Sequence, residues 1–318
     1  MQANDALKPD VSRATGGTAL SVVREIVLSM RPRQWTKNLI IFLPLAFTVN
    51  QHWRLSELPY IGRLILSSFT AFVLFCLLSG AVYLINDLAD IEKDRQHPLK
   101  RNRPLASGRL GRFPTNVSIL LLVIVSLVGA SLLNWVFGVI ALVYFTIMIA
   151  YTFRLKHIVL VDVMTIAVGY VLRAVAGATA IEVPISPWLY VCTILLALFI
   201  VLGKRRHELL LLENDASRHR QILLEYTPQF LEQLMVLVGG ATLMAYSLYT
   251  FSAENVPKNY AMMLTIPFVL YGIFRYLYLI NIKNEGGSPE EILITDRPLV
   301  IDLALWLVTS AAILMLFR

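Results

Sequence analysis

Long apolar runs alternate with short polar stretches along almost the whole chain. Each run approaches the roughly 20 residues that an α-helix needs to cross a bilayer. The centres of the runs are nearly free of charge, and polar or turn-forming residues separate them. The pattern predicts an all-α polytopic membrane protein with about nine transmembrane helices, placed at residues 38–52, 61–85, 116–134, 136–153, 159–181, 187–203, 231–251, 260–281 and 298–317.

The composition agrees with this pattern. Of the 318 residues, 57% are hydrophobic and only 15% are charged, which is too apolar for a soluble domain. The first 20 or so residues are polar and lack the apolar core of a signal peptide. We therefore expect a disordered cytoplasmic N-terminal tail at residues 1–24 and a single transmembrane catalytic domain at residues 25–318.

The net charge of +7 is explained by its distribution and does not require a nucleic-acid partner. With a cytoplasmic N-terminus, the opposite side carries little more than Arg54, Arg63, Lys258 and Arg318. Such asymmetry is the positive-inside pattern of integral membrane proteins. It places on the cytoplasmic side Lys8, Arg13, Arg24, Arg31, Arg33, Lys37, the stretch 93–112, Arg154, Lys156, the stretch 204–220, Lys283 and Arg297.

An acidic segment lies at the end of the second apolar run, on this cytoplasmic side. Asn86, Asp90 and Asp94 are four residues apart. On an α-helix this spacing turns each side chain by about 40° and raises it by about 6 Å, so the three share one face. Like charges at this spacing weaken a helix unless a cation compensates them. Oxygen ligands of this kind suit Mg²⁺, which one or two carboxylates and substrate phosphates usually hold.

Cations next to the acidic segment are candidates for binding phosphate groups. A basic loop follows it directly, and further cations stand at the ends of other runs, where the alternative is a simple topology signal or an interfacial anchor. The predicted substrate-binding residues are Lys37, Arg95, Lys100, Arg101, Arg103, Tyr151, Lys156, Arg173, Lys204, Arg205 and Arg206.

Two ionisable residues fall inside the fifth apolar run. Such residues are costly in a membrane and usually face a cavity or one another. Asp162, near the cytoplasmic end, is the natural second carboxylate of a catalytic site with Asn86, Asp90 and Asp94; helix capping is its alternative. Arg173 lies deeper, where it either binds a phosphate or pairs with an acidic residue.

These residues carry a resemblance to a known family. Asn86-Asp87-x-x-Asp90-x-x-x-Asp94 at a span end resembles the first signature of the UbiA-type intramembrane prenyltransferase superfamily. Four other segments resemble its branch of decaprenyl-phosphate phosphoribosyltransferases. They are Arg31-Pro32-x-Gln34-Trp35-x-Lys37-Asn38, His97-Pro98-x-Lys100-Arg101-x-Arg103-Pro104-x-Ala106-Ser107-Gly108, Gly203-Lys204-Arg205-Arg206-x-Glu208-Leu209 and Asp296-Arg297-Pro298-Leu299.

The resemblance implies a UbiA-like bundle with cytoplasmic cap loops in the plasma membrane, which is the inner membrane of a bacterium. It implies that Asn86, Asp90 and Asp94 hold Mg²⁺ against the diphosphate of 5-phosphoribosyl 1-diphosphate. The acceptor would be a polyprenyl (decaprenyl) phosphate, and the product would serve cell-envelope polysaccharide synthesis. We also expect membrane lipids as partners, no nucleic acid, and a homo-oligomer as one candidate assembly.

Two rival functions would require charged residues at positions where this sequence lacks them. An aromatic prenyltransferase of the same fold carries a second Asp-rich motif, whereas Asp162 is followed four residues later by Ile166. A membrane transporter places charges near the middle of its spans, whereas the acidic residues here gather at one end. Both features favour phosphoribosyl transfer.

Overall fold

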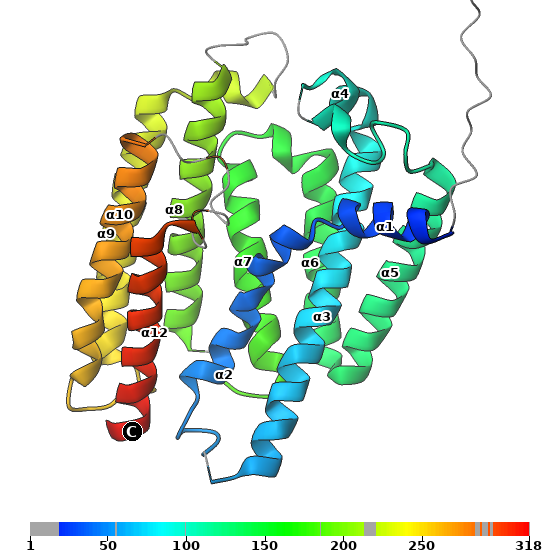
Figure 1. Ribbon diagram of the computed structural model, residues 1–318. Helices are drawn as coiled ribbons and strands as arrows, with labels where there is room; N and C mark the ends of the chain where they lie inside the picture. Colours follow the sequence, from blue (N-terminus) through cyan, green and yellow to red (C-terminus); the bar gives the residue numbers. More distant parts are fainter. Residues whose placement is uncertain are drawn as a thin grey trace, which may run out of the picture.

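The computed structural model is a bundle of helices that run roughly side by side (Figure 1). It describes residues 19–54, 56–98, 100–184, 186–212, 221–283, 287, 292 and 295–317. Among these residues, eight helices are long and apolar enough to cross a membrane, which confirms the all-α polytopic class. They are α3 (Leu58–Ala89), α5 (Arg112–Leu133), α6 (Trp135–Phe153), α7 (Val161–Ala180), α8 (Pro187–Leu212), α9 (Pro228–Ser252), α10 (Ile266–Asn281, preceded by the 3₁₀ turn η5, Ala261–Thr265) and α12 (Arg297–Phe317).

The first of the nine expected spans is not an ordinary transmembrane helix. In its place stand a 3₁₀-helix, η1 (Pro32–Phe42), and one short α-helix, α2 (Leu43–Phe47). At rises of about 2.0 and 1.5 Å per residue, these elements together reach about 30 Å. They lead from the level of α1 toward the end of the bundle where α3 begins (Figure 1). The segment therefore replaces the span expected at 38–52, and the count of nine helices is not confirmed.

The helix ends follow local chemistry. The two runs that the sequence barely separates become α5 and α6, and Asn134 lies between them. Its side-chain oxygen accepts hydrogen bonds from the backbone N–H groups of Val136 and Phe137, at 2.9 and 3.2 Å, and so caps α6. One asparagine is thus enough to end one helix and start the next.

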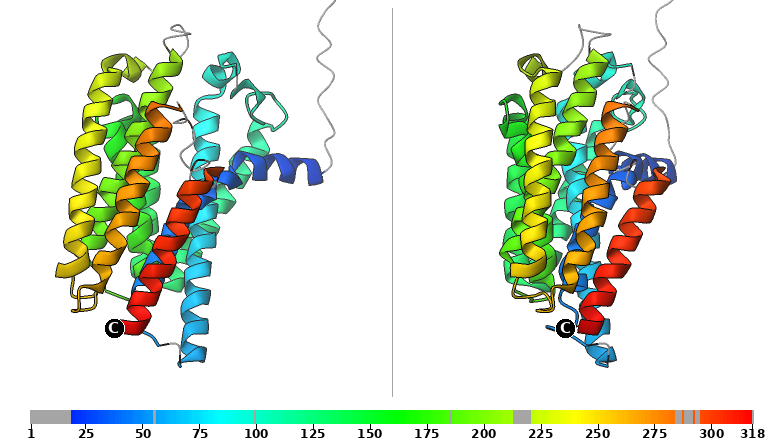
Figure 2. Two further views of the ribbon diagram at one scale, coloured as in Figure 1. Left: turned by 60° about the vertical axis from the view of Figure 1, so that its left-hand side comes forward. Right: turned by 90° about the vertical axis from the view of Figure 1, so that its left-hand side faces the viewer.

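A separate helix, α1 (Ala19–Ser29), lies across the direction of the spans (Figure 1, Figure 2). It begins before the expected domain boundary at residue 24, while residues 1–18 of the expected tail lie outside the described residues. The apolar side chains of Leu20 and Val23 are 82% and 57% exposed. An exposed apolar face on a helix that lies across the bundle is typical of interfacial helices.

The outer surface of the bundle is apolar. Leu132 in α5, Leu237 in α9 and Val308 in α12 are 82%, 69% and 66% exposed. The interior also buries polar residues, such as Asn38 and Thr250. This is the distribution expected where hydrocarbon, and not water, surrounds the helices.

The 3₁₀-helix η1 packs against α7 at very close range. A Cβ atom at Gly177 would lie 2.1 Å from the carbonyl oxygen of Ile41. One turn away, Arg173 donates a hydrogen bond of 2.6 Å from Nε to the Asn38 side-chain oxygen. Because 3₁₀ runs longer than three or four residues are uncommon, we infer that these contacts hold η1 in this form.

Gly177→Ala is expected to force η1 away from α7. Overpacking of this kind costs about 1–3 kcal/mol, so the midpoint of thermal unfolding in lipid nanodiscs should fall. Gly240→Ala is the matched control, because no heavy atom lies within 4 Å of a Cβ at Gly240 in α9. Equal midpoints for the two variants would contradict the close contact between η1 and α7.

Candidate active site

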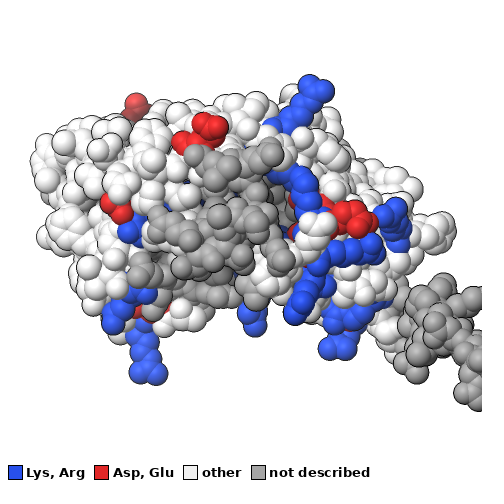
Figure 3. Space-filling model, turned by 90° about the horizontal axis from the view of Figure 1, so that it is seen from above, with Lys and Arg blue, Asp and Glu red and all other residues white. Residues whose placement is uncertain are grey.

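The charged residues singled out by the sequence meet at one end of the bundle. Three short helices, α4 (Ile91–Gln96), η2 (Lys100–Asn102) and η3 (Leu155–His157), lie there beside the C-terminal ends of α3 and α6. Seen from this end, acidic side chains lie among those of Lys and Arg (Figure 3). The candidate site is therefore a polar patch at the end of an apolar bundle.

The four-residue spacing of the acidic segment survives a break in the helix. α3 ends at Ala89, α4 begins at Ile91, and Asp90 joins them. The Asp90 N–H donates to the Asn86 carbonyl at 3.0 Å, and the Asp94 N–H donates to the Asp90 carbonyl at 2.8 Å. The backbone thus keeps helical connections from Asn86 through Asp90 to Asp94.

Each carboxylate of this segment is paired with a cation. Lys156 Nζ lies 2.9 and 3.2 Å from the two oxygens of Asp90. Arg103 Nη1 lies 2.6 Å from Asp94 Oδ2 and 3.1 Å from Asp87 Oδ1. Arg31 also donates to Asp87. We call these residues the acidic cluster: Asp87, Asp90, Asp94, Arg31, Arg103 and Lys156.

Two members of the acidic cluster were absent from the predicted site. Asp87 is 2% exposed and binds two guanidinium groups. Its position beside Asn86 was a usable signal, but the spacing argument selected only every fourth residue. Arg31 comes from a different segment, just before η1, and only the fold brings it to Asp87.

Asp162 belongs to a second network. Its carboxylate is fully buried and accepts hydrogen bonds from Arg205 Nε and from the Tyr226 hydroxyl, both at 2.8 Å. Arg205 also binds Glu208 and donates to the Tyr151 hydroxyl at 3.1 Å. Both oxygens of Asp162 are thus engaged within the second network: Asp162, Arg205, Glu208, Tyr151 and Tyr226.

Tyr226 remains a hydrogen-bond donor at any physiological pH. Burial raises the pKa of its phenol to about 12, although a backbone hydrogen bond from Leu160 opposes that shift. The hydroxyl accepts from the Leu160 N–H at 2.7 Å and donates to Asp162. It therefore fixes the turn that leads into α7.

Other predicted substrate-binding cations have their own partners. Arg95 binds Glu92 and the Ala106 carbonyl, and Arg206 binds Glu232 at 2.7 Å. Arg101 is exposed. Interactions also engage the other three, Lys37, Lys100 and Lys204. Of the predicted cations, the structure brings Arg103 and Lys156 directly to the carboxylates of the acidic segment.

Arg173 lies away from both networks, inside the bundle. Its partners in the described part of the chain are neutral: the Asn38 side chain, the Gly169 carbonyl at 2.8 Å and the Tyr144 hydroxyl at 2.7 Å. Its guanidinium also lies over the Tyr144 ring, 4.7 Å from the centroid. Of the two alternatives for Arg173, a pairing with an acidic residue is absent from its described contacts, and phosphate binding stays a prediction. In the structure, Arg173 ties η1, α6 and α7 together.

The donor set of the acidic segment fits a hard divalent cation. Asn86, Asp90 and Asp94 offer only oxygen atoms, on consecutive helical turns. Among the described residues, no group of three or more His, Cys, Asp or Glu side chains is placed so that it could hold a metal ion by itself. Mg²⁺ needs no such group, because it keeps waters and takes substrate phosphates as ligands.

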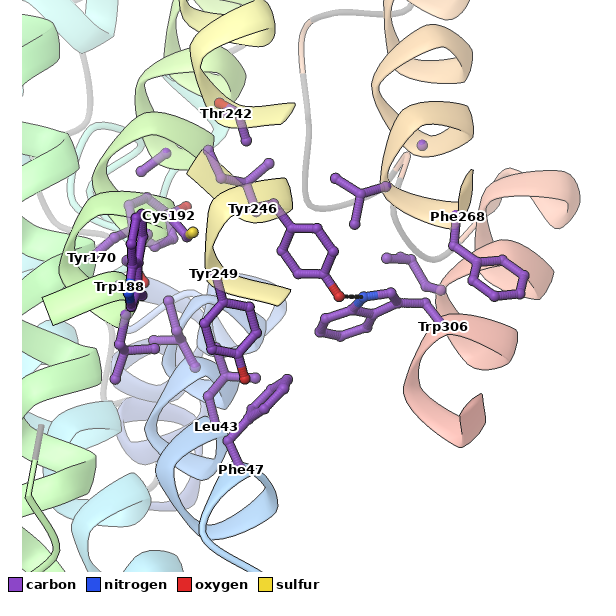
Figure 4. Close-up of a pocket in the computed structure, with 18 of the residues that line it drawn as sticks. Leu43, Phe47, Tyr170, Trp188, Cys192, Thr242, Tyr246, Tyr249, Phe268 and Trp306 are labelled. Carbon is purple, nitrogen blue, oxygen red and sulfur yellow. Dashed lines mark hydrogen bonds between the residues drawn. The ribbon is translucent and has the colours of Figure 1, made fainter. Parts of the chain in front are cut away.

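An apolar cavity of about 390 Å³ lies between the helices. Its walls come from η1, α2, α7, α8, α9, α10 and α12, and aromatic side chains line much of it (Figure 4). The Tyr246 hydroxyl and the Trp306 indole N–H face each other across 2.8 Å at one wall. The volume and lining suit an apolar ligand.

The fold and the site together define an integral membrane protein with a charged site at one end and an apolar cavity within. The UbiA prenyltransferase family model matches residues 39–290. The decaprenyl-phosphate phosphoribosyltransferase of Mycobacterium tuberculosis is 32% identical over 292 residues, which cover 92% of this chain and 95% of the relative. The enzyme of the same name from Corynebacterium glutamicum is 31% identical, with 88% and 84% coverage.

The chain therefore belongs to the UbiA prenyltransferase family, as its motifs predicted. A solved UbiA homologue from Archaeoglobus fulgidus, bound to DMAPP and Mg²⁺, superposes with a TM-score of 0.69. The match covers 92% of this chain and 99% of the homologue at 18% identity. At that identity the likeness shows the fold alone, and it confirms the UbiA-like bundle.

The second network yields a stability prediction. Arg205→Met leaves the buried Asp162 carboxylate without its cation, at a cost of about 3–5 kcal/mol. Arg206→Met, the same change one residue later, should cost less, because its partner Glu232 is 43% exposed and water can solvate it. Adding Asp162→Leu to Arg205→Met should restore most of the loss in thermal stability. A double variant as unstable as the single one would show that Arg205 does not serve Asp162.

Proposed function

We propose that this protein transfers the 5-phosphoribosyl group from 5-phosphoribosyl 1-diphosphate to a polyprenyl phosphate such as decaprenyl phosphate, releasing diphosphate. The observation that carries the proposal is the acidic cluster, in which carboxylates and cations alternate at the end of a transmembrane bundle. The names of the mycobacterial and corynebacterial relatives support this choice of substrates.

Asn86, Asp90 and Asp94 would hold Mg²⁺. When bound, Mg²⁺ would neutralise negative charge that develops on the diphosphate as it leaves. Arg31, Arg103 and Lys156 supply hydrogen-bond donors within the same cluster. Arginine and lysine bind phosphate oxygens well, arginine through two parallel bonds.

The reaction needs no general base. A lipid phosphate oxygen forms a bond to C1 of the ribose from the face opposite the diphosphate. The C1–O bond to the diphosphate breaks, and the diphosphate leaves with the electron pair. Because the phosphate nucleophile is already ionised, the side chains contribute positioning and electrostatic stabilisation.

The two substrates would approach from different phases. Cation-rich loops favour a cytoplasmic location for the site, where a soluble sugar phosphate reaches it, in the plasma membrane of a bacterium. The apolar cavity would take part of the polyprenyl chain, which enters from the bilayer. The product, a polyprenyl phosphoribose, would feed cell-envelope polysaccharide synthesis.

An aromatic prenyltransferase is the second candidate, since solved relatives of the same fold bind DMAPP or GPP with Mg²⁺. Two features weigh against it. A second Asp-rich motif would need another carboxylate four residues after Asp162, but Ile166 stands there. In addition, Arg205 and Tyr226 engage both oxygens of Asp162. A second metal at Asp162 would have to compete with these partners for the carboxylate.

Transfer can be measured directly with purified protein in nanodiscs. Label from radiolabelled 5-phosphoribosyl 1-diphosphate should pass into an organic-phase lipid only when polyprenyl phosphate and Mg²⁺ are present. Asp90→Asn and Asp94→Asn should each lower the rate at least about a hundredfold, because a lost metal ligand removes several kcal/mol of stabilisation. Glu92→Gln is the matched control from the same helix, since Glu92 is 71% exposed.

Product from an isoprenoid diphosphate and an aromatic acceptor, with no labelled lipid from the sugar donor, would favour the second candidate. Near-normal Mg²⁺-dependent transfer by both Asp variants would show that the acidic segment is not the metal site.

Filling the cavity should affect one substrate alone. Leu189→Trp replaces an aliphatic side chain in the cavity wall with a bulkier indole. The KM for polyprenyl phosphate should therefore rise about tenfold, the effect of losing roughly 1.4 kcal/mol of binding. The KM for the sugar donor should stay constant. Leu248→Trp, on a part of α9 outside the cavity lining, is the matched control. Equal changes in both KM values would contradict a lipid-binding role for the cavity.

A further inference from the structure

The oxygens that would bind the metal are already engaged by cations of this chain. Lys156 spans both oxygens of Asp90, and the ammonium is almost completely buried, with its side chain 5% exposed. Arg103 lies 2.6 Å from Asp94 Oδ2. A metal at Asp90 would therefore compete with the Lys156 ammonium for the same carboxylate.

The formal charges of the acidic cluster sum to zero. Asp87, Asp90 and Asp94 are matched by Arg31, Arg103 and Lys156, all within direct contact. A divalent cation added alone would stand beside positive charges in a site of reduced dielectric, where like charges repel strongly. A divalent cation that binds together with a diphosphate also brings negative charge. The cations of the cluster can then bind the diphosphate in place of the carboxylates.

Lys156 is better suited than Arg103 to leave its carboxylate and bind the diphosphate. Arg103 remains bonded to Asp87 when it leaves Asp94, because one nitrogen contacts both carboxylates. The only ion-pair partner of Lys156 in the described part of the chain is Asp90. Its ammonium is a compact charge on a flexible four-carbon stem, so it can change partners without the planar two-bond geometry that an arginine guanidinium uses.

We propose that Lys156 competes with the metal for Asp90 and passes from Asp90 to the diphosphate, so that metal and diphosphate bind as a pair. Each then strengthens the binding of the other by the same factor, as linkage requires. The inference rests on the proposed function in taking Asp90 as a metal ligand and diphosphate as the anion. It adds that the chain itself weakens binding of the metal alone.

The wild-type protein provides the first test. Equilibrium dialysis of Mn²⁺ against protein in nanodiscs, at matched free Mn²⁺ concentration, measures metal binding with and without inorganic diphosphate. We expect diphosphate to tighten Mn²⁺ binding at least tenfold. Mn²⁺ binding that is equally tight in both conditions would overturn the proposal, whatever the variants do.

Lys156→Met provides the second test, because it removes the competing charge and keeps the apolar stem. Mn²⁺ binding without diphosphate should become at least tenfold tighter, and retention of ³²P-labelled diphosphate with Mg²⁺ should fall. Lys258→Met, an exposed lysine in the loop at the other end of the bundle, is the matched control and should change neither. Asp90→Asn added to Lys156→Met should abolish the gain.

Unchanged or weaker Mn²⁺ binding in a folded Lys156→Met variant would overturn the proposal. A merely structural role for Lys156 predicts that result, because loss of the ammonium would then only disturb Asp90. The proposed function fails separately. If no label passes from 5-phosphoribosyl 1-diphosphate to lipid while the Mn²⁺ and diphosphate results hold, the cluster binds a metal–diphosphate pair for another reaction.

Discussion

A charge buried at the end of a membrane bundle must have a partner, and this constraint organises the whole molecule. Desolvation makes a lone buried carboxylate or ammonium very costly, so a stable fold must bring opposite charges together. Lys156 comes to Asp90 from 66 residues away, and Arg205 comes to Asp162 from 43 residues away. These pairs join the ends of α3, α6, α7 and α8, which apolar packing alone would leave free to slide.

The two networks solve the same problem with different consequences. In the second network, both oxygens of Asp162 are engaged, and Arg205 contacts two carboxylates and a phenol. Such a closed arrangement fixes geometry. In the acidic cluster, Asp90 is 18% exposed and Arg103 is 26% exposed, so water and solutes reach them. The Asp90 carboxylate is therefore accessible to a ligand, whereas the fully buried Asp162 carboxylate serves as a support.

Local features of this structure could be predicted from the sequence, and features that join distant segments could not. The runs near 116–134 and 136–153 became α5 and α6 because Asn134 is a local cap. The spacing of Asn86, Asp90 and Asp94 is likewise local, and the backbone preserves it. By contrast, no pattern within one segment indicates that Arg31 reaches Asp87 or that Tyr226 reaches Asp162. The 3₁₀ form of η1 also escaped prediction, because it depends on the close approach of Ile41 to Gly177.

The same η1 segment connects the polar site with the apolar cavity. Just before its first residue, Arg31 reaches Asp87, while Ile40 near its end lines the cavity. A 3₁₀-helix rises about 2.0 Å per residue, so η1 covers a distance that would need about a third more residues in an α-helix. Between these ends, Asn38 accepts a hydrogen bond from Arg173, which fixes η1 to α7. Because η1 is fixed to α7 and borders both regions, it would set the distance between a ligand in the cavity and charges in the cluster. Arg173 therefore matters to the site through the position of η1, without any need to touch a phosphate.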